Sequence, residues 1–246
     1  MTLEVNGTVA RLVFDRPDVL NAGDARWVAD LTRACQALAA EKTVRVVVMT
    51  GRGRAFQTGV DLQALARGEV RLDDLVRWED AMTAMERMDK LFIAAINGHA
   101  IGGGLQLALV CDYRLASADA LVGLPAVKEC LVPSMALYRL PRLIGLGRAQ
   151  DLILTGRLIS AADAERYGLV NRVVPPGAFA AALDETIEMF LALPETSAGV
   201  SKRLVPRAFD LPFDDFRREM QAGLADCFAS DEHRAAMAAI LARRRR

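Results

Sequence analysis

Two buried-strand signals, each followed by a glycine turn, constrain the fold of this chain most. The run Val44–Met49 is mostly β-branched and the run Leu91–Ile96 is entirely apolar, and such runs are typical of strands covered on both faces of a parallel sheet. Each run leads into a glycine-containing segment that opens a helical pattern, at Ala55–Leu62 and at Asn97–Leu105. Strands that alternate with helices predict an α/β fold with parallel pairing and right-handed crossovers.

Periodicity and capping signals predict further elements on both sides of these runs. Alternation over Val9–Phe14 predicts a strand, and Asp24 is a good N-cap for the helical pattern that follows it. A second amphipathic helix is predicted over residues 75–90. Two short strands are predicted at Tyr113–Ala116 and Leu121–Val122.

From about Leu140 the pattern is almost wholly helical. We therefore divide the chain into a core of residues 1–194 and a C-terminal helical region of residues 195–246. Apolar residues form a stripe along this helical region. The stripe can pack on the core of the same chain or on another subunit.

The overall charge excludes one broad class of partner. Lys and Arg together number 31, as do Asp and Glu, so the chain lacks the basic excess of a general nucleic-acid binder. The run Arg243–Arg246 is a local exception, which we interpret as the solvated end of a helix. No signal peptide is visible, and the apolar runs are too short for a membrane span. We expect a cytoplasmic protein without membrane or nucleic-acid partners.

The cysteines and histidines give no pattern for a metal site or a disulfide framework. They are few and lack metal-ligand spacing: Cys35, Cys111, Cys130, Cys227, His99 and His233. We expect reduced, mostly buried thiols. No metal is predicted.

The two glycine segments suggest a specific kind of binding site. Glycine lets the backbone approach a ligand closely, and a helix that begins there points free N–H groups at the same spot. Such a place suits an anion, or an oxygen that becomes anionic during a reaction. Neither segment has the spacing of a nucleotide-binding loop. The alternative is that both segments are tight turns without a ligand.

Several segments in a fixed order make the chain similar to the crotonase (enoyl-CoA hydratase/isomerase) family. Together they cover residues 9–175 almost without gaps, and they are FDRPDVLNA (14–22), AFQTGVDL (55–62), AAINGHAIGGG (94–104), CDYRLA (111–116), LPRLIG (140–145), LTGR (154–157) and AADAERYGLVN (161–171). The resemblance implies a spiral of ββα turns with a C-terminal helical trimerisation region. It also implies homotrimers or dimers of trimers.

The resemblance further implies an acyl-CoA substrate, with coenzyme A as part of the substrate and no separate cofactor. The backbone N–H groups of Val60 and Gly103 are the implied oxyanion hole, which holds the thioester oxygen. The implied substrate contacts are Val19, Asn21, Ala22, Gly59, Asp61, Gly102 and Ala126. Asp61 is more simply explained as a helix cap.

The chain departs from the family pattern where the reaction is decided. Family hydratases use two glutamates, and this chain has Gln106 and Ala126 at those positions. Glutamine does not take up a proton at neutral pH, and alanine has no polar group. We interpret Gln106 as a substrate contact through its amide. Hydration by a glutamate pair is therefore not favoured.

A third position that other family members use for catalysis holds Ser134, with Tyr138 one helical turn later. Ser134 can orient water or substrate, or can simply cap the helix that follows. Glu129 is the acid closest to the second missing glutamate, and we interpret it as a surface residue.

These observations predict an acyl-CoA lyase or isomerase that forms an enolate, with a role in fatty acid metabolism. Double-bond isomerisation, decarboxylation of a malonyl-type thioester and hydrolysis are the candidate reactions, with Val60, Gly103, Gln106 and Ser134 as catalytic residues. A degenerate member that binds acyl-CoA or a partner without turnover is the main alternative. Residual hydration, with Glu129 or a bound water in place of the glutamates, is a third possibility.

Overall fold

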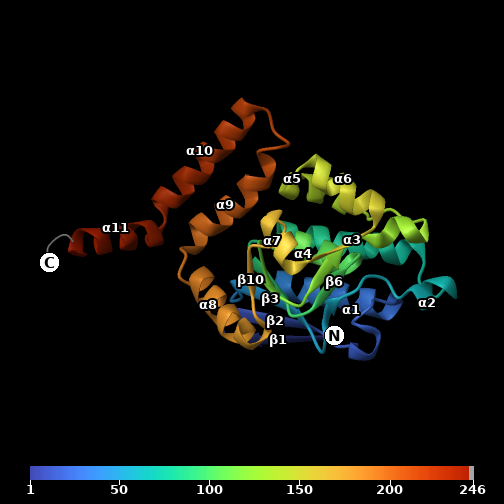
Figure 1. The fold of residues 1–246 in the computed structure, drawn as a ribbon. Helices are drawn as coiled ribbons and strands as arrows, with labels where there is room; N and C mark the ends of the chain where they lie inside the picture. The colour runs from blue at the N-terminus through green and yellow to red at the C-terminus, as the bar shows by residue number, and fades with distance from the viewer. Residues whose placement is uncertain (244–246) are drawn as a thin grey trace.

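Two β-sheets form the centre of the protein, whose computed structural model describes residues 1–243 (Figure 1). The larger sheet contains, in spatial order, β1 (Thr2–Asn6), β2 (Val9–Phe14), β3 (Val46–Gly51), β5 (Leu91–Ile96), β7 (Tyr113–Ser117) and β10 (Arg172–Val174). The smaller sheet contains β4 (Ala55–Gln57), β6 (His99–Ile101), β8 (Leu121–Gly123) and β9 (Leu158–Ser160). Pairing is parallel as predicted, except that β1–β2 and β8–β9 are antiparallel.

The chain visits the two sheets alternately, and this confirms the predicted spiral of ββα turns. Each turn places one strand in the larger sheet and the next in the smaller sheet, as β3–β4, β5–β6 and β7–β8. Helices return the chain to the larger sheet after the first two pairs, namely α2 (Leu62–Ala66) and α3 (Leu72–Arg87) after β4 and α4 (Gly103–Leu109) after β6. After β8, helices α5 (Ala136–Ile144) and α6 (Leu146–Thr155) lead instead to β9 of the smaller sheet, and the chain then reaches β10 of the larger sheet.

The larger sheet is buried on both faces, which explains the continuous apolar runs. Val47 and Met49 of β3 join the main core beneath α1 (Ala25–Ala40) and α3. Val46 and Val48 point the other way, into a smaller core that is covered by α8 (Phe179–Leu191). Successive side chains of a strand face opposite sides, so a strand between two cores has no polar face.

Asp24 caps α1 as predicted, because its carboxylate accepts a hydrogen bond from the Trp27 N–H at 2.8 Å.

The region after Leu140 is less helical than predicted, since β9 and β10 lie within it. Both are three-residue strands that pair with β8 and β7. Three residues carry no readable alternation, and neighbouring strands decide such short elements. Helix α7 (Ala161–Arg166) lies between them.

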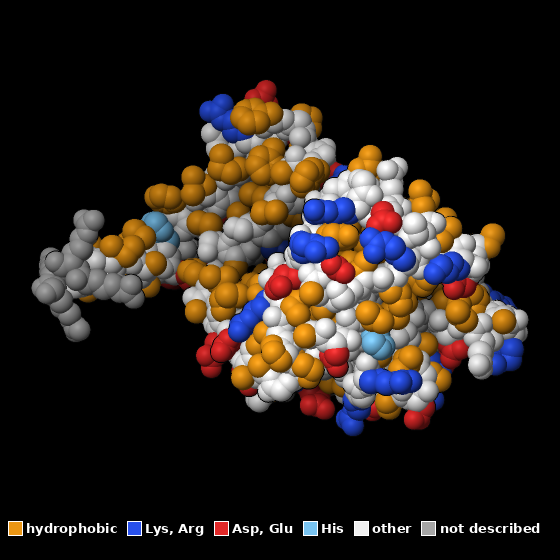
Figure 2. Space-filling model, in the orientation of Figure 1, with side chains coloured by type: hydrophobic (Ala, Val, Ile, Leu, Met, Phe, Trp, Pro, Cys, Tyr) orange, Lys and Arg blue, Asp and Glu red, His pale blue; other side chains and the backbone are white. Residues whose placement is uncertain are grey.

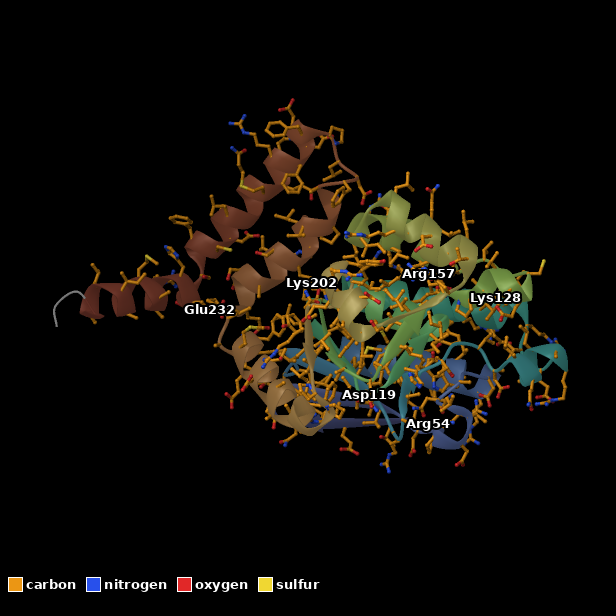
Figure 3. The ribbon with its side chains drawn as sticks, in the orientation of Figure 1. Arg54, Asp119, Lys128, Arg157, Lys202 and Glu232 are labelled. Carbon is orange, nitrogen blue, oxygen red and sulfur yellow. The ribbon has the colours of Figure 1, made fainter. Side chains whose placement is uncertain are left out.

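The C-terminal region contains α9 (Glu195–Arg207), α10 (Phe213–Ala229) and α11 (Asp231–Arg243), which extend to one side of the sheets (Figure 1). Lys202 attaches α9 to the core, because its ammonium donates to the Lys90 carbonyl at 2.5 Å and pairs with Asp112 at 2.9 Å (Figure 3). Of the run Arg243–Arg246, which was predicted to be the solvated end of a helix, Arg243 is the last residue of α11 and residues 244–246 lie outside the described residues.

The cysteines are less uniformly buried than predicted. Cys35 and Cys111 are buried, and burial raises the pKa of both thiols to about 12. Cys130 is exposed because it follows a short 3-10 helix, Pro125–Glu129, at the surface, and Cys227 is half-buried.

Among residues 1–243, we find no helix with the length and apolar character to cross a bilayer.

Candidate functional site

The pairing of two short strands brings the glycine turns together. Strands β4 and β6 are parallel neighbours, so their carboxyl ends lie side by side. The chain leaves these strands through Gly59 and Gly102, whose φ angles of +92° and +57° favour glycine. The turns are in close contact, since a Cβ atom on Gly59 would lie 3.2 Å from the Gly103 nitrogen.

A buried glutamine that the sequence analysis gave no role fixes the first turn. The Gln57 side chain donates from Nε2 to the Gly59 carbonyl at 3.0 Å and accepts from the Gly59 N–H at 2.6 Å. A Cβ atom on Gly104 would lie 1.8 Å from the Gln57 carbonyl oxygen, so this third glycine permits α4 to pack on β4. Gln57 and Gly104 therefore hold both turns at a fixed separation.

In the part of the chain that the structure describes, hydrogen bonding leaves the Val60 N–H free in the first turn and the Gly103 N–H, at the start of α4, free in the second turn. The N–H groups on either side of Val60 have acceptors, because Gly59 donates to Gln57 and Asp61 donates to Gly23 at 2.9 Å. Gly102 donates to Gly123 at 2.9 Å. Within residues 1–243, neither the Val60 nor the Gly103 N–H donates to a protein atom. These are the two groups predicted to form an oxyanion hole.

Both turns border a cavity of about 550 Å³, a size suited to a small organic ligand. The cavity is also bounded by α3 and by the segment 131–135. Its apolar lining can accommodate an acyl chain and consists of Leu62, Leu72, Leu75, Val76, Trp78, Met82, Leu131, Val132 and Met135.

Gln106 and Ala126, which the sequence resemblance aligns with two hydratase glutamates, both line this cavity. The Gln106 Oε1 atom is buried and has no hydrogen-bond partner among the described residues. A buried acceptor without a partner costs about 1–3 kcal/mol, so a ligand that donates to it would gain affinity. The side chain is thus suited to the predicted amide contact.

Ser134 also lines the cavity, but its hydroxyl does not cap the following helix. The N-cap of α5 is Met135, which makes no side-chain cap hydrogen bond. Ser134 instead donates from Oγ to Oε2 of Glu79 at 2.8 Å, and its φ angle of 41° is unusual for a residue with a side chain. The alternative interpretation of Ser134 as a helix cap was wrong.

The sequence analysis missed Glu79, the carboxylate that Ser134 contacts. Glu79 lies on α3 and lines the cavity, and its Oε1 atom is 2.8 Å from Arg139 Nη1. The sequence does contain a pattern that points to Glu79. The polar residues Glu79, Thr83 and Glu86 recur at helical spacing along α3. They lie beside the buried apolar stripe of the same helix, which consists of Trp78, Met82 and Met85. That polar stripe faces Arg139, which hydrogen-bonds to Glu86 and Thr83.

Two other residues considered from the sequence lie in different surroundings. Glu129 lines the cavity and is exposed, as a surface residue would be. Tyr138 borders a second cavity of about 640 Å³ beneath the C-terminal helices. Its hydroxyl donates to Asp210, and this hydrogen bond raises the pKa of the phenol. Tyr138 is therefore not part of the first cavity.

The predicted CoA-contact residues near the first turn lie outside the cavity lining. Asn21 is fully buried, and its amide donates to the Arg52 and Ala55 carbonyls at 3.0 and 2.8 Å. Its side-chain amide holds the loop, and the substrate contact predicted for Asn21 stays a prediction. Val19 is exposed and Ala22 is buried.

Asp61 caps α2 as expected, because its carboxylate accepts from the Gln63 and Ala64 N–H groups at 3.2 and 3.1 Å. His99 has a structural role, since Nδ1 accepts a hydrogen bond from the Leu121 N–H at 3.2 Å. No group of three or more His, Cys, Asp or Glu side chains in residues 1–243 is arranged to hold a metal ion.

Comparisons with known proteins agree on one family. Residues 4–245 match the family model for enoyl-CoA hydratase/isomerase. A Rhizobium meliloti (strain 1021) protein named "Probable enoyl-CoA hydratase" is 33% identical over 250 residues, which cover 100% of this chain and 96% of that protein.

Solved structures with a similar fold carry names from the same family. An enoyl-CoA hydratase subunit from Geobacillus kaustophilus HTA426 has a TM-score of 0.90 and 35% identity, covering 98% of this chain and 95% of its own. A Thermobifida fusca YX protein solved "in complex with CoA" has a TM-score of 0.84 and 32% identity, covering 93% of this chain and 92% of its own.

Proposed function

Because the chain belongs to the enoyl-CoA hydratase/isomerase family, we propose that it binds an acyl-CoA thioester and transforms it through an enolate. In this proposal the thioester oxygen accepts hydrogen bonds from the Val60 and Gly103 N–H groups. The observation that carries the proposal is that these two N–H groups, on touching turns beside an apolar cavity, donate to no protein atom in residues 1–243.

The physical basis is the movement of charge onto the thioester oxygen. When an enolate forms, negative charge shifts from the α carbon to this oxygen. Donors that are already oriented stabilise the charge without reorganisation, and loss of one donor costs about 3 kcal/mol in related chemistry. Because both donors are backbone groups, valine at position 60 is compatible with this role.

The proposed reaction is isomerisation, decarboxylation of a malonyl-type thioester or hydrolysis, rather than hydration by two glutamates. Gln106 and Ala126 support this preference, because neither side chain exchanges a proton at neutral pH. Gln106 would orient the substrate by accepting a hydrogen bond at its buried Oε1 atom. The relatives' names point to hydration, which is therefore the competing reaction that an experiment must measure.

A panel of acyl-CoA substrates tests this proposal. Double-bond migration, CO₂ release and release of free CoA would be followed separately, together with the hydration of crotonyl-CoA. We expect turnover in one of the first three assays and little hydration. Hydration as the dominant activity would contradict the preferred reactions. Turnover that survives both Gln106→Ala and Ser134→Ala unchanged would contradict the roles given to these side chains.

Binding without turnover is the second candidate function, and the absence of both hydratase glutamates favours it. Calorimetry with a saturated, unreactive acyl-CoA separates it from the first. Binding together with no product in any assay would support this candidate. No binding at all would contradict both.

We also propose that the chain forms a homotrimer or a dimer of trimers through its C-terminal helices. Large apolar side chains are exposed on α9 and α10 and in the turn between them, as Figure 2 shows for one face, including Val205, Phe209, Phe213, Leu224 and Phe228. Exposed apolar surface of this extent is typical of an interface. Sedimentation equilibrium would test the assembly, and a monomer at micromolar concentration would contradict it.

A further inference from the structure

Glu79 lines the same cavity as the two turns and lies on a helix that contacts the second of them. The residue before it, Trp78, packs directly on the second turn, because a Cβ atom on Gly103 would lie 2.7 Å from the indole ring. The same turn of α3 therefore contacts the backbone of the proposed oxyanion hole and carries Glu79 into the cavity lining.

The charges around Glu79 leave one carboxylate in excess. Arg139 is 6% exposed and lies between two carboxylates, with Nη1 2.8 Å from Glu79 and Nη2 3.1 Å from Glu86. No other basic side chain in residues 1–243 forms an ion pair with either carboxylate. One guanidinium cannot neutralise two carboxylates, so the pair formed by Glu79 and Glu86 retains one negative charge beside the cavity.

The two carboxylate oxygens of Glu79 differ in their contacts. Oε1 faces Arg139 and also accepts a hydrogen bond from Thr83 at 3.3 Å. Oε2 accepts only the Ser134 hydroxyl among the described residues, at 2.8 Å. A carboxylate oxygen has about two acceptor positions, so Oε2 retains one for a proton from a ligand.

The backbone at Ser134 is strained in the conformation that makes this contact. A positive φ costs a residue with a side chain about 1–3 kcal/mol, and such strain persists where surrounding structure imposes it. Here the strain accompanies a hydroxyl group that is directed at Glu79 rather than at the adjacent helix end. This arrangement is suited to keeping the carboxylate in one orientation.

We propose that Glu79 is the catalytic base and acid of this site, with Ser134 and Arg139 as positioning residues, and that the reaction is double-bond migration in an unsaturated acyl-CoA. The inference rests on the proposed binding of a thioester by Val60 and Gly103. Its starting observation is the spare acceptor position of the half-buried Glu79 carboxylate in the cavity that the two turns border.

The step balances without water or a cofactor. Glu79 Oε2 takes a proton from the α carbon of a β,γ-unsaturated thioester, and the C–H electron pair forms a dienolate whose negative oxygen lies at the two N–H groups. The protonated Glu79 then returns a proton to the γ carbon. The double bond moves to the α,β position, and the thioester carbonyl re-forms.

The test compares Glu79→Gln with Asp73→Asn, an acid-to-amide change on the same helix at an exposed residue outside the cavity lining. A 3-enoyl-CoA is the substrate, and the formation of conjugated 2-enoyl-CoA is the readout. We expect Glu79→Gln to lose about 10²- to 10⁴-fold in kcat, as removal of a general base does, and Asp73→Asn to stay near the parent rate. Affinity for a saturated acyl-CoA, measured by calorimetry, should be unchanged in both.

Chemical rescue distinguishes a base from a structural side chain. Glu79→Ala opens space at the carboxylate position, and added acetate or formate should restore part of the isomerisation rate. A side chain that only supports packing would not be rescued. Circular dichroism and thermal unfolding of each variant verify that it is folded.

Each outcome distinguishes this inference from the function on which it rests. Isomerisation that is unchanged in Glu79→Gln, or lost in Glu129→Gln instead, would overturn the role of Glu79 alone. CO₂ or CoA release without double-bond migration in the parent protein would overturn the inference and leave the proposed function intact. Failure to bind any acyl-CoA would overturn both.

Discussion

The two walls of the cavity are built in different ways. The backbone wall comprises Gly59, Val60, Gly102 and Gly103, and its proposed contacts with a ligand are main-chain N–H groups. The side-chain wall comprises Trp78, Glu79, Met82, Ser134 and Met135, and its proposed contacts are functional groups. The backbone wall uses no side-chain functional group, so it can retain one binding mode as long as its glycines are kept. The side-chain wall can change the reaction by substitution of a few residues.

Among the variants that follow, the largest effect is expected from blocking the backbone wall. In Gly59→Ala the new methyl group would lie 3.2 Å from the Gly103 nitrogen, between the two turns. We expect kcat to fall by about 10²- to 10³-fold, the usual result of losing one oxyanion donor. The assay is turnover of whichever acyl-CoA the parent protein transforms.

Gly68→Ala is the matched control for this variant. Gly68 has a φ angle of +71°, close to the +92° of Gly59, but an added methyl group has no neighbour within 4 Å. Both variants should lose about 1 kcal/mol of unfolding free energy from backbone strain. Equal turnover in the two would contradict the role of the backbone wall.

A second prediction restores the hydratase groups opposite the same backbone wall. The double variant Gln106→Glu and Ala126→Glu places two carboxylates on positions that already line the cavity. We expect hydration of crotonyl-CoA to rise by about 10²-fold over the parent protein, because positioned acid–base groups contribute at least this much. The measurement is the loss of the conjugated double bond.

Each single variant is the control for the double variant, and neither alone should reach its rate. A double variant that hydrates no faster than the parent protein would show that the missing glutamates do not limit hydration. In that case the geometry of the backbone wall itself would differ from that of a hydratase.

A smaller effect is expected from the hydroxyl group on the side-chain wall. Ser134→Ala removes the 2.8 Å hydrogen bond to Glu79. A hydrogen bond to a charged group contributes about 1.5–3 kcal/mol, so we expect kcat to fall by at least about tenfold. KM should change little, because the hydroxyl orients Glu79 rather than binding CoA.

Ser134→Gly separates the hydroxyl from the strained backbone. Glycine adopts the φ angle of 41° without strain, so this variant should unfold at a higher temperature than Ser134→Ala. Both variants lack the hydroxyl and should lose the same activity. A loss of activity that follows unfolding temperature instead would assign Ser134 a structural role.

The smallest effect on kcat is expected for the buried side chain that supports the first loop. Asn21→Ala leaves the Arg52 and Ala55 carbonyls without their donor, which we expect to lower the free energy of unfolding by about 1–3 kcal/mol. Chemical denaturation would measure this, with the exposed Asn6→Ala as a control. If Asn21→Ala instead lost CoA affinity strongly and kept its unfolding free energy, Asn21 would be a CoA-binding residue.

The sequence predicted the backbone wall better than the side-chain wall for a physical reason. Glycines after buried strands report where the main chain turns and where a helix begins, so Val60 and Gly103 could be singled out. The strand pairing then brings these positions together. Asn21, in contrast, stands in a recognisable motif, but only the structure reveals that its amide is used within the loop.

Glu79 could not be assigned from the sequence, because its meaning depends on partners that lie 55 and 60 residues away at Ser134 and Arg139. A glutamate on an amphipathic helix is ordinarily a solvated residue. The strands β9 and β10 were missed for a related reason, since their pairing partners rather than their three residues determine them.

A crystal structure with an unreactive acyl-CoA analogue tests the central claim most directly. The account predicts a thioester oxygen within about 3 Å of both the Val60 and the Gly103 nitrogen, with the acyl chain directed toward Glu79. A bound analogue whose carbonyl lies away from these nitrogens, or amides that point in different directions, would contradict the account.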